Sequence, residues 1–182
     1  MILKNEFCII TVSVNEQFSF GDPKNKKYDI VLNPKNYNAE DRIKAFEFDV
    51  NLFKEQKKIA LISLIGEPAG DIAVLDGTIL TLLQNEAFLQ IDVVKGEIIG
   101  IKPTDMFGSV LSLNKFGDDY IVHGEIEIAR YNRDLEKLWS FSGRDIFASI
   151  TGKRAFEMSD NSIKIYDFQD NYYEIDYDGK EI

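Results

Sequence analysis

The 182-residue chain has little of the chemistry that enzyme sites use most often. It contains one cysteine, one histidine and one tryptophan. A single cysteine cannot form an intrachain disulfide, so the composition favours a reducing compartment. Cys8 lies in the apolar stretch FCIITVSV and is expected to be a small buried hydrophobic residue rather than a nucleophile.

Several motifs of catalysis and cofactor binding are also missing. No Gly-x-Ser-x-Gly, Gly-x-Gly-x-x-Gly or Gly-Lys-Ser/Thr pattern occurs, although these are the patterns of hydrolase nucleophiles and phosphate-binding loops. Carboxylate pairs are abundant, but no pair is marked out as the two acids of a glycosidase. We therefore predict no catalytic residue, no metal ligand and no cofactor.

Basic residues are scarce relative to acidic ones, with 21 Lys and Arg against 31 Asp and Glu, and the formal net charge is −10. Such a chain repels phosphate backbones and anionic membrane surfaces, so neither nucleic acid nor membrane is an expected partner. Residues 159–182 carry two lysines and seven carboxylates: Asp160, Asp167, Asp170, Glu174, Asp176, Asp178 and Glu181. This acidic run is either a solvated face or a surface that attracts a basic protein.

Long apolar runs are absent as well. None approaches the roughly 20 residues that a membrane-spanning helix needs, and the first residues, MILKNEFCIITVSVNEQF, lack the pattern of a signal peptide. The sequence therefore predicts a cytoplasmic protein.

What the chain does have is a repeated alternation of short apolar runs and polar turns. Three segments share it: Gly70–Lys102, Ser109–Ser142 and Ile146–Asp178. Their starts lie 39 and 37 residues apart, which is typical of four-stranded β-propeller blades. Each segment is expected to form strand, turn, strand, turn, strand, turn, strand.

Turn-forming residues recur in step along these segments. Gly77, Gly117 and Gly152 are assigned to the first turn, where glycine tolerates a positive φ. The second turn is assigned to three dipeptides: Gln84-Asn85, His123-Gly124 and Asp160-Asn161.

The first third of the chain is interpreted as an extended copy of the same unit. FCIITVSV and YDIVLNP serve as its first two strands, and residues 21–27 and 33–42 as loops, the second with room for one helical turn. The prediction is one all-β domain over residues 1–182, a small or partial β-propeller of about four four-stranded antiparallel units. The predicted units are 6–65, 70–102, 109–142 and 146–182, with Gly66–Gly70 as a boundary or an ordinary loop.

One stretch carries a family resemblance. IARYNRDLEKLWSFSG, from Ile128 to Gly143, resembles the blade motif of quinoprotein-type β-propellers, in which an Asp-containing turn leads into a strand opened by Leu-Trp. LQIDVVKGEIIG looks like the same motif without its tryptophan, and YEIDYDGKEI repeats the Asp–turn–Gly pattern one strand later. Leu135 stands where the family has glycine. The resemblance implies blade-like folding and no cofactor residue; the chain is also similar to small acidic bacterial proteins.

The lone histidine forms the pattern His123-x-Glu125-x-Glu127. If His123-Gly124 is a hairpin tip, the imidazole does not share a strand face with the two carboxylates. On an uninterrupted strand the three side chains would point the same way, but zinc sites usually use several His or Cys ligands. We therefore favour a structural role for His123 over a metal site.

Two groups of residues are candidate binding positions. In SFSGRDIF, Arg144 and Asp145 form either an ion pair packed on its own neighbours or a contact for a carboxylate or phosphate. Tyr172 and Tyr173 form either core-covering tyrosines or an aromatic contact patch. Trp139 is expected in the core.

The functional prediction is a noncatalytic binding or protein-interaction protein. A sharper alternative is an acidic antitoxin or immunity-type protein that binds a basic toxin. Another alternative is a hydrolase that uses carboxylates or a weakly held metal at Glu125 and Glu127. A homodimer that closes the stack of sheets is a further partner left open.

Overall fold

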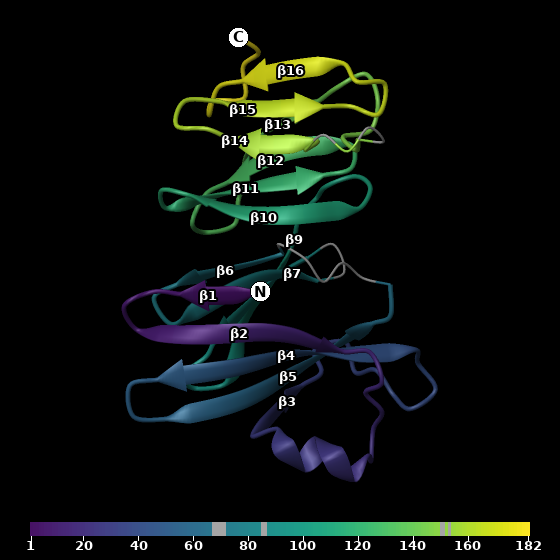
Figure 1. Ribbon diagram of the computed structural model, residues 1–182, viewed down its shortest axis with the longest axis vertical. Coiled ribbons are helices and arrows are strands. Elements are labelled where there is room, and N and C mark those ends of the chain that lie inside the picture. The colour runs from purple at the N-terminus through teal and green to yellow at the C-terminus, as the bar shows by residue number, and fades with distance from the viewer. Residues whose placement is uncertain (67–71, 85–86, 150–151, 153) are drawn as a thin grey trace. The chain divides into compact units, whose positions relative to one another are not determined.

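The computed structural model describes residues 1–66, 72–84, 87–149, 152 and 154–182. The chain forms two compact units, Met1–Lys102 and Pro103–Ile182. The described residues form sixteen strands in four sheets and contain one short 3-10 helix and no α-helix. This confirms the predicted all-β class and the prediction of about four propeller-like units (Figure 1). That residues 1–182 act as a single domain stays a prediction.

The first unit contains two sheets. The five-stranded sheet has the order β1-β2-β4-β5-β3, and the four-stranded sheet has the order β6-β7-β8-β9. The strands of the first sheet are β1 (Ile2–Lys4), β2 (Cys8–Asn15), β3 (Ile30–Leu32), β4 (Ile43–Leu52) and β5 (Gln56–Leu64). Those of the second sheet are β6 (Ala73–Asp76), β7 (Ile79–Gln84), β8 (Ala87–Asp92) and β9 (Glu97–Pro103), whose last residue already belongs to the second unit.

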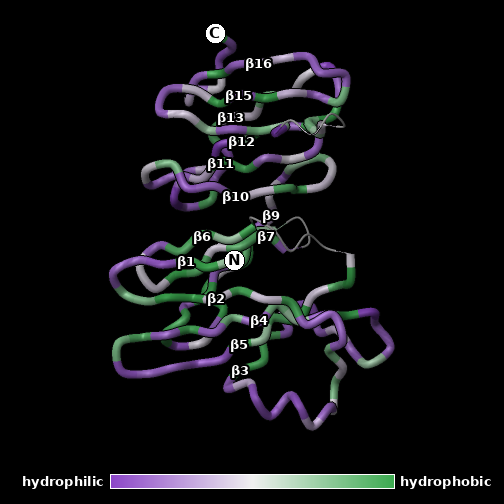
Figure 2. Tube along the Cα trace, viewed as in Figure 1, coloured by the Kyte–Doolittle hydropathy of each residue, from purple (hydrophilic) through white to green (hydrophobic). Residues whose placement is uncertain are grey.

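The first sheet departs from the predicted four-stranded pattern. The predicted strand FCIITVSV forms β2 and pairs with β4, but YDIVLNP contributes β3, which pairs with β5 at the far edge and in parallel. The predicted helical turn lies at Pro23–Lys27 (η1) instead of in residues 33–42. The segment around η1 is mainly hydrophilic (Figure 2).

The second unit also contains two sheets. One is an up-and-down sheet of β10 (Val110–Phe116), β11 (Asp119–Gly124), β12 (Glu127–Tyr131) and β13 (Lys137–Ser142). The other has three strands, β14 (Phe156–Met158), β15 (Ile163–Tyr166) and β16 (Tyr172–Ile175), and an isolated antiparallel bridge between Ile175 and Glu181 extends it.

The same turn recurs after the third strand of three sheets. A left-handed residue occurs in each copy: Leu135 (φ 61°) and Gly179 (φ 78°) come three residues after the Asx that opens the turn, and Gly96 (φ 71°) comes four residues after it. An Asx side chain accepts backbone N–H bonds at the start of each turn: Asp92 from Val94 and Lys95, Asn132 from Glu136, and Asp176 from Asp178 and Lys180. Leu135 therefore adopts the conformation that the resemblance reserves for glycine.

The register predicted for the fourth unit is wrong by one strand. Residues 146–149 form no strand, and β14 begins only at Phe156, after Gly152. Asp160-Asn161 therefore closes the first hairpin of this sheet, and YEIDYDGKEI occupies the same turn as its two sister motifs. Gly77 and Gly117 do lie in first turns with positive φ. The turn at Gln84-Asn85 falls partly outside the described residues, as does most of Gly66–Gly70.

Trp139, predicted in the core, is half-buried and packs against the core of the second unit from its edge. Its ring packs at the edge of a buried apolar cluster, and its Nε1 donates to the carbonyl oxygen of Tyr177 at 3.0 Å. The Arg130 guanidinium donates to the same carbonyl at 2.7 Å and pairs with Asp119 at 2.6 Å. The Tyr177 ring stacks on Phe116 with a centroid distance of 3.8 Å. These contacts bind the last turn of the fourth sheet to the third.

We expect Gly96→Ala to lower the free energy of unfolding by about 2 to 4 kcal/mol, because a Cβ at this positive φ also crowds a neighbour. The added carbon would lie 1.8 Å from Cδ1 of Ile30. Gly77→Ala is the matched control, since its φ is 58° and nothing lies within 4 Å of its added Cβ; it should cost only about 1 kcal/mol. Urea denaturation measures both, and equal losses would contradict the packing account.

Candidate functional site

The structure brings together three of the four predicted binding residues. The backbone N–H of Arg144 donates to the Tyr173 hydroxyl oxygen at 3.0 Å. The Tyr173 hydroxyl in turn donates to Oδ2 of Asp167 at 2.9 Å. Asp145 follows Arg144 directly and accepts a hydrogen bond from the N–H of Ile146 at 2.8 Å. The loop after β13 is therefore anchored to β16 through a buried tyrosine.

Asp167 holds this junction together from the interior. Its carboxylate is fully buried and accepts hydrogen bonds from the N–H groups of Gln169 and Asn171, the Asn171 side chain and Tyr173. Burial alone would raise the pKa of Asp167, but these donors outweigh it and hold the pKa below its ordinary value. Asp167 therefore does not belong to the acidic surface on which its sequence position would place it.

Tyr172 lies on the opposite face of β16 from Tyr173 and is 47% exposed. Its hydroxyl donates to Oε2 of Glu174 at 2.6 Å, and this bond and partial burial raise the pKa of Tyr172 to about 12. Its ring lies 5.2 Å from that of Tyr166. The exposed Arg144 guanidinium makes no hydrogen bond or ion pair with a described residue. Arg144 and Tyr172 thus both present side chains to solvent, whereas the buried Tyr173 supports the backbone of Arg144.

His123 is not at a hairpin tip, which corrects the predicted turn. It lies inside β11, paired with Ile128 of β12, and the turn falls at residues 125–126. Its Nε2–H donates to the carbonyl oxygen of Phe147 at 3.1 Å, and its ring stacks on Phe156 at 4.8 Å. The sequence placed the tip too early because His-Gly has ordinary turn chemistry; strand pairing decided otherwise.

The two carboxylates that follow His123 hold a neighbouring loop. Glu127 is buried, accepts a hydrogen bond from the N–H of Phe107 at 3.0 Å and lies 3.5 Å from the ammonium of Lys137. Glu125 accepts from the N–H of Ser109 at 3.3 Å. Among the described residues, no group of three or more His, Cys, Asp and Glu side chains is placed to hold a metal ion.

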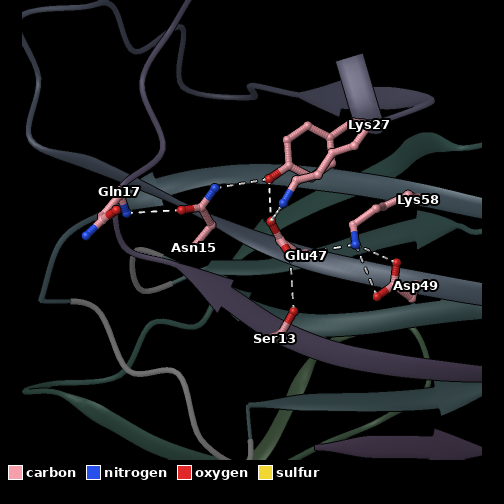
Figure 3. Close-up of polar contacts among 8 residues, drawn as sticks. Ser13, Asn15, Gln17, Lys27, Glu47, Asp49 and Lys58 are labelled. Carbon is pink, nitrogen blue, oxygen red and sulfur yellow. Dashed lines mark hydrogen bonds and ion pairs between the residues drawn. The ribbon is translucent and has the colours of Figure 1, made fainter. Parts of the chain in front are cut away.

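A second polar cluster, in the first unit, was not found from the sequence. Glu47 on β4 accepts hydrogen bonds from Lys27 at 2.6 Å, from Ser13 at 3.3 Å and from the hydroxyl of Tyr28 (Figure 3). Burial raises the pKa of Glu47, but the bonds from Lys27 and Tyr28 outweigh it, so the pKa lies below its ordinary value. This cluster binds the end of η1 and the residue after it to the first sheet.

The signal that could have revealed this cluster is the alternation FEFDVN in β4. Glu47 and Asp49 are two residues apart and point to one face of the sheet. Asp49 is directly opposite Lys58 of β5, and their charged groups are 3.0 Å apart (Figure 3). Cross-strand pairs of opposite charge stabilise sheets, so the neighbouring lysines of QKKIAL were a readable clue.

The comparisons with known proteins find matches at low sequence identity among solved structures alone. No protein-family model and no curated protein matches the sequence. Among solved structures, BamB from Moraxella catarrhalis is 12% identical with a TM-score of 0.49 over 78% of this chain and 44% of its own. Hsv2p from Kluyveromyces lactis is 12% identical with a TM-score of 0.44 over 79% of this chain and 47% of its own.

The N-terminal domain of Nup159 is 8% identical with a TM-score of 0.46, over 98% of this chain and 50% of that domain. All three are β-propeller proteins, and the chain spans about half the length of each. At these scores the comparisons assign no family and no function. No helix among the described residues is long and apolar enough to cross a membrane.

We expect Tyr28→Phe to lower the free energy of unfolding by about 1 to 2 kcal/mol, because it leaves the buried Glu47 carboxylate one donor short. Tyr172→Phe deletes the same atom at an exposed site and should change stability by less than about 0.5 kcal/mol. Chemical denaturation of both variants at pH 7 measures the difference. If Tyr28→Phe lowered the free energy of unfolding no more than Tyr172→Phe does, the Glu47 cluster would contribute little to folding.

The burial of His123 predicts an acid-sensitive fold. Desolvation lowers the pKa of His123 from its ordinary value of 6.5 to about 4, so the unfolded chain binds the proton more tightly. Stability must therefore fall as pH drops from about 6.5 to about 4. Between pH 7 and pH 4.5, the free energy of unfolding of the wild type should fall by about 2 to 3 kcal/mol more than that of His123→Gln. Urea titration at each pH measures both values. Parallel losses in the two proteins would refute this.

Proposed function

We propose that this chain is a noncatalytic protein-binding module whose second unit presents an acidic, aromatic surface to a basic protein. The observation that carries the proposal is the exposed Tyr172 within the acidic segment of residues 159–182. Its phenol is held by Glu174, so the ring is restrained before any partner arrives. Restrained, exposed tyrosines are favoured at protein interfaces.

The charges of residues 159–182 support a basic partner. Asp160, Asp176 and Glu181 form no ion pair with a described residue, and Asp178 lies 4.0 Å from Arg130. Carboxylates left without a cation produce a negative potential that attracts and orients a positively charged protein. The burial of Asp167 removes one charge from the predicted surface and leaves the rest in place.

Arg144 and Asp145 extend the proposed contact at the loop after β13. The Arg144 guanidinium suits a carboxylate of the partner, because its planar fork binds such groups through two hydrogen bonds. Tyr173 supports this loop, since its hydroxyl fixes the backbone of Arg144. The binding role of all four predicted residues is part of this proposal.

A more specific form is an acidic antitoxin or immunity-type protein that blocks a basic toxin through this surface. The exposed carboxylates of residues 159–182 favour it. A cytoplasmic location belongs to the same proposal, because Cys8 is a free, buried thiol. The hydrolase alternative gains no support from Glu125 and Glu127, since both carboxylates are engaged by backbone N–H groups of residues 107–109.

Affinity capture with the purified chain tests the proposal. At low salt it should retain a basic protein in about equimolar amount, and at ~0.5 M salt most of this binding should be lost because the exposed charges are screened. Tyr172→Ala should weaken the binding at least about tenfold, measured by calorimetry with the captured protein.

A pair of neutralised variants separates local charge from net charge. Asp160→Asn/Glu181→Gln should weaken binding, whereas Asp118→Asn/Glu136→Gln, with the same charge change elsewhere in the second unit, should not. Recovery of no basic protein at low salt would contradict the proposal. So would equal effects of the two double variants.

A further inference from the structure

An apolar hollow opens at one end of the first sheet. The turn after β1 and the tip of the β4–β5 hairpin enclose about 400 Å³ there. The apolar side chains that line it are Phe7, Cys8, Ile9, Leu52 and Phe53. Phe53 is 90% exposed and Phe7 is 49% exposed. Two exposed aromatic rings beside an apolar hollow indicate a surface that is covered in use.

The ring of Phe53 cannot be covered by its own hairpin. Leu52 and Glu55 close the tip, with N–H···O distances of 2.8 and 3.4 Å between their backbones. Phe53 and Lys54 are the two residues of this tight turn, so their side chains project beyond the end of the sheet. The surface at this end of the first sheet therefore has both a projecting Phe53 ring and an apolar hollow.

Charges at the hollow favour a second copy of the chain as its occupant. Lys4 and Glu6 both line the hollow, and neither forms an ion pair with a described residue. One positive and one negative charge make the patch locally neutral on a chain whose net charge is −10. In a two-fold interface, residue i meets residue j and j meets i. Lys4 of one copy can then pair with Glu6 of the other, twice in each dimer.

We infer that this chain forms a two-fold symmetric homodimer in which each Phe53 ring enters the hollow of the other copy, with reciprocal Lys4–Glu6 pairs at its rim. The interface lies on the first unit, whereas the surface proposed for the basic partner lies on the second. Either proposal can therefore fail without the other.

Sedimentation equilibrium over about 1 to 500 µM tests the dimer directly. Wild type should show a reversible monomer–dimer equilibrium, and Phe53→Ser should raise the dissociation constant at least about 100-fold, because each dimer loses two central aromatic anchors. Phe107→Ser is the matched control, since Phe107 is 78% exposed but lies in the second unit; it should leave the dimer unchanged. A wild type that stays monomeric throughout would overturn the inference, as would a Phe53→Ser variant that still dimerises.

Charge reversal tests the symmetry of the contact. Lys4→Glu alone and Glu6→Lys alone should each weaken self-association about tenfold, because like charges then face each other twice. An equimolar mixture of the two variants should restore association as a heterodimer. One of its contacts joins the two substituted side chains, which have opposite charges, and the other keeps the original Lys4–Glu6 pair. The proposed arrangement would be overturned if the single variants self-associated as tightly as the wild type. It would also be overturned if the mixture of the two variants did not associate.

Two other occupants of the hollow are outcomes of the same experiment. Flotation with phosphatidylserine vesicles would assign the patch to a membrane if a monomeric wild type bound and Phe53→Ser did not. Calorimetry with the captured basic protein would assign it to that protein if Phe53→Ser abolished the binding of a monomeric wild type. Either result would overturn the homodimer.

Discussion

The architecture depends on one constraint: a sheet of three to five short strands cannot bury both of its faces by itself, so it must pack against a neighbour. In the second unit, Ile121 and Ile128 of the third sheet share one buried cluster with Ile163 and Ile165 of the fourth. In the first unit, the Gln84 side chain reaches across and donates to the carbonyl of Ile62 at 2.6 Å.

The same packing decides which polar side chains are available for binding. Asp167, Glu47 and His123 are drawn into the interior, where each must be satisfied by hydrogen bonds because an unpaired buried polar group is costly. The partners of Glu47 and His123 come from other segments of the chain, so each fastens two segments together, whereas Asp167 orders its own loop and the start of β16. The side chains that remain exposed, such as Tyr172 and Phe53, lie at a strand edge and a hairpin tip. Both proposed contact surfaces consist of these residues.

Much of the fold could be read from the sequence because its cues are local. Gly77 and Gly117 mark first turns because glycine tolerates a positive φ. In each copy of the Asx turn, an Asp or Asn side chain bonds to a backbone N–H a few residues later, and such a short separation can be seen in the sequence. The register of the fourth sheet could not be read in this way. Asp160-Asn161 suits the turn of any hairpin. The alternation of apolar and polar side chains has a period of two in every strand, so it does not tell one strand from the next. Only the pairing of the strands shows whether a turn is the first or the second of its sheet. His123-Gly124 was misplaced for the same reason.

The sequence by itself determined the all-β class, the repeat of short strands and the acidic character, because these follow from composition, strand periodicity and backbone preferences of single residues. Tertiary structure decided which charges are buried and which apolar groups meet. Asp167 and Asp160 look alike in the sequence, yet one is satisfied inside and the other faces solvent. Phe7 and Phe53 line one hollow only because β2 and β4 pair along their length, and such long-range pairing is set by the packing of whole sheets, which no local pattern encodes.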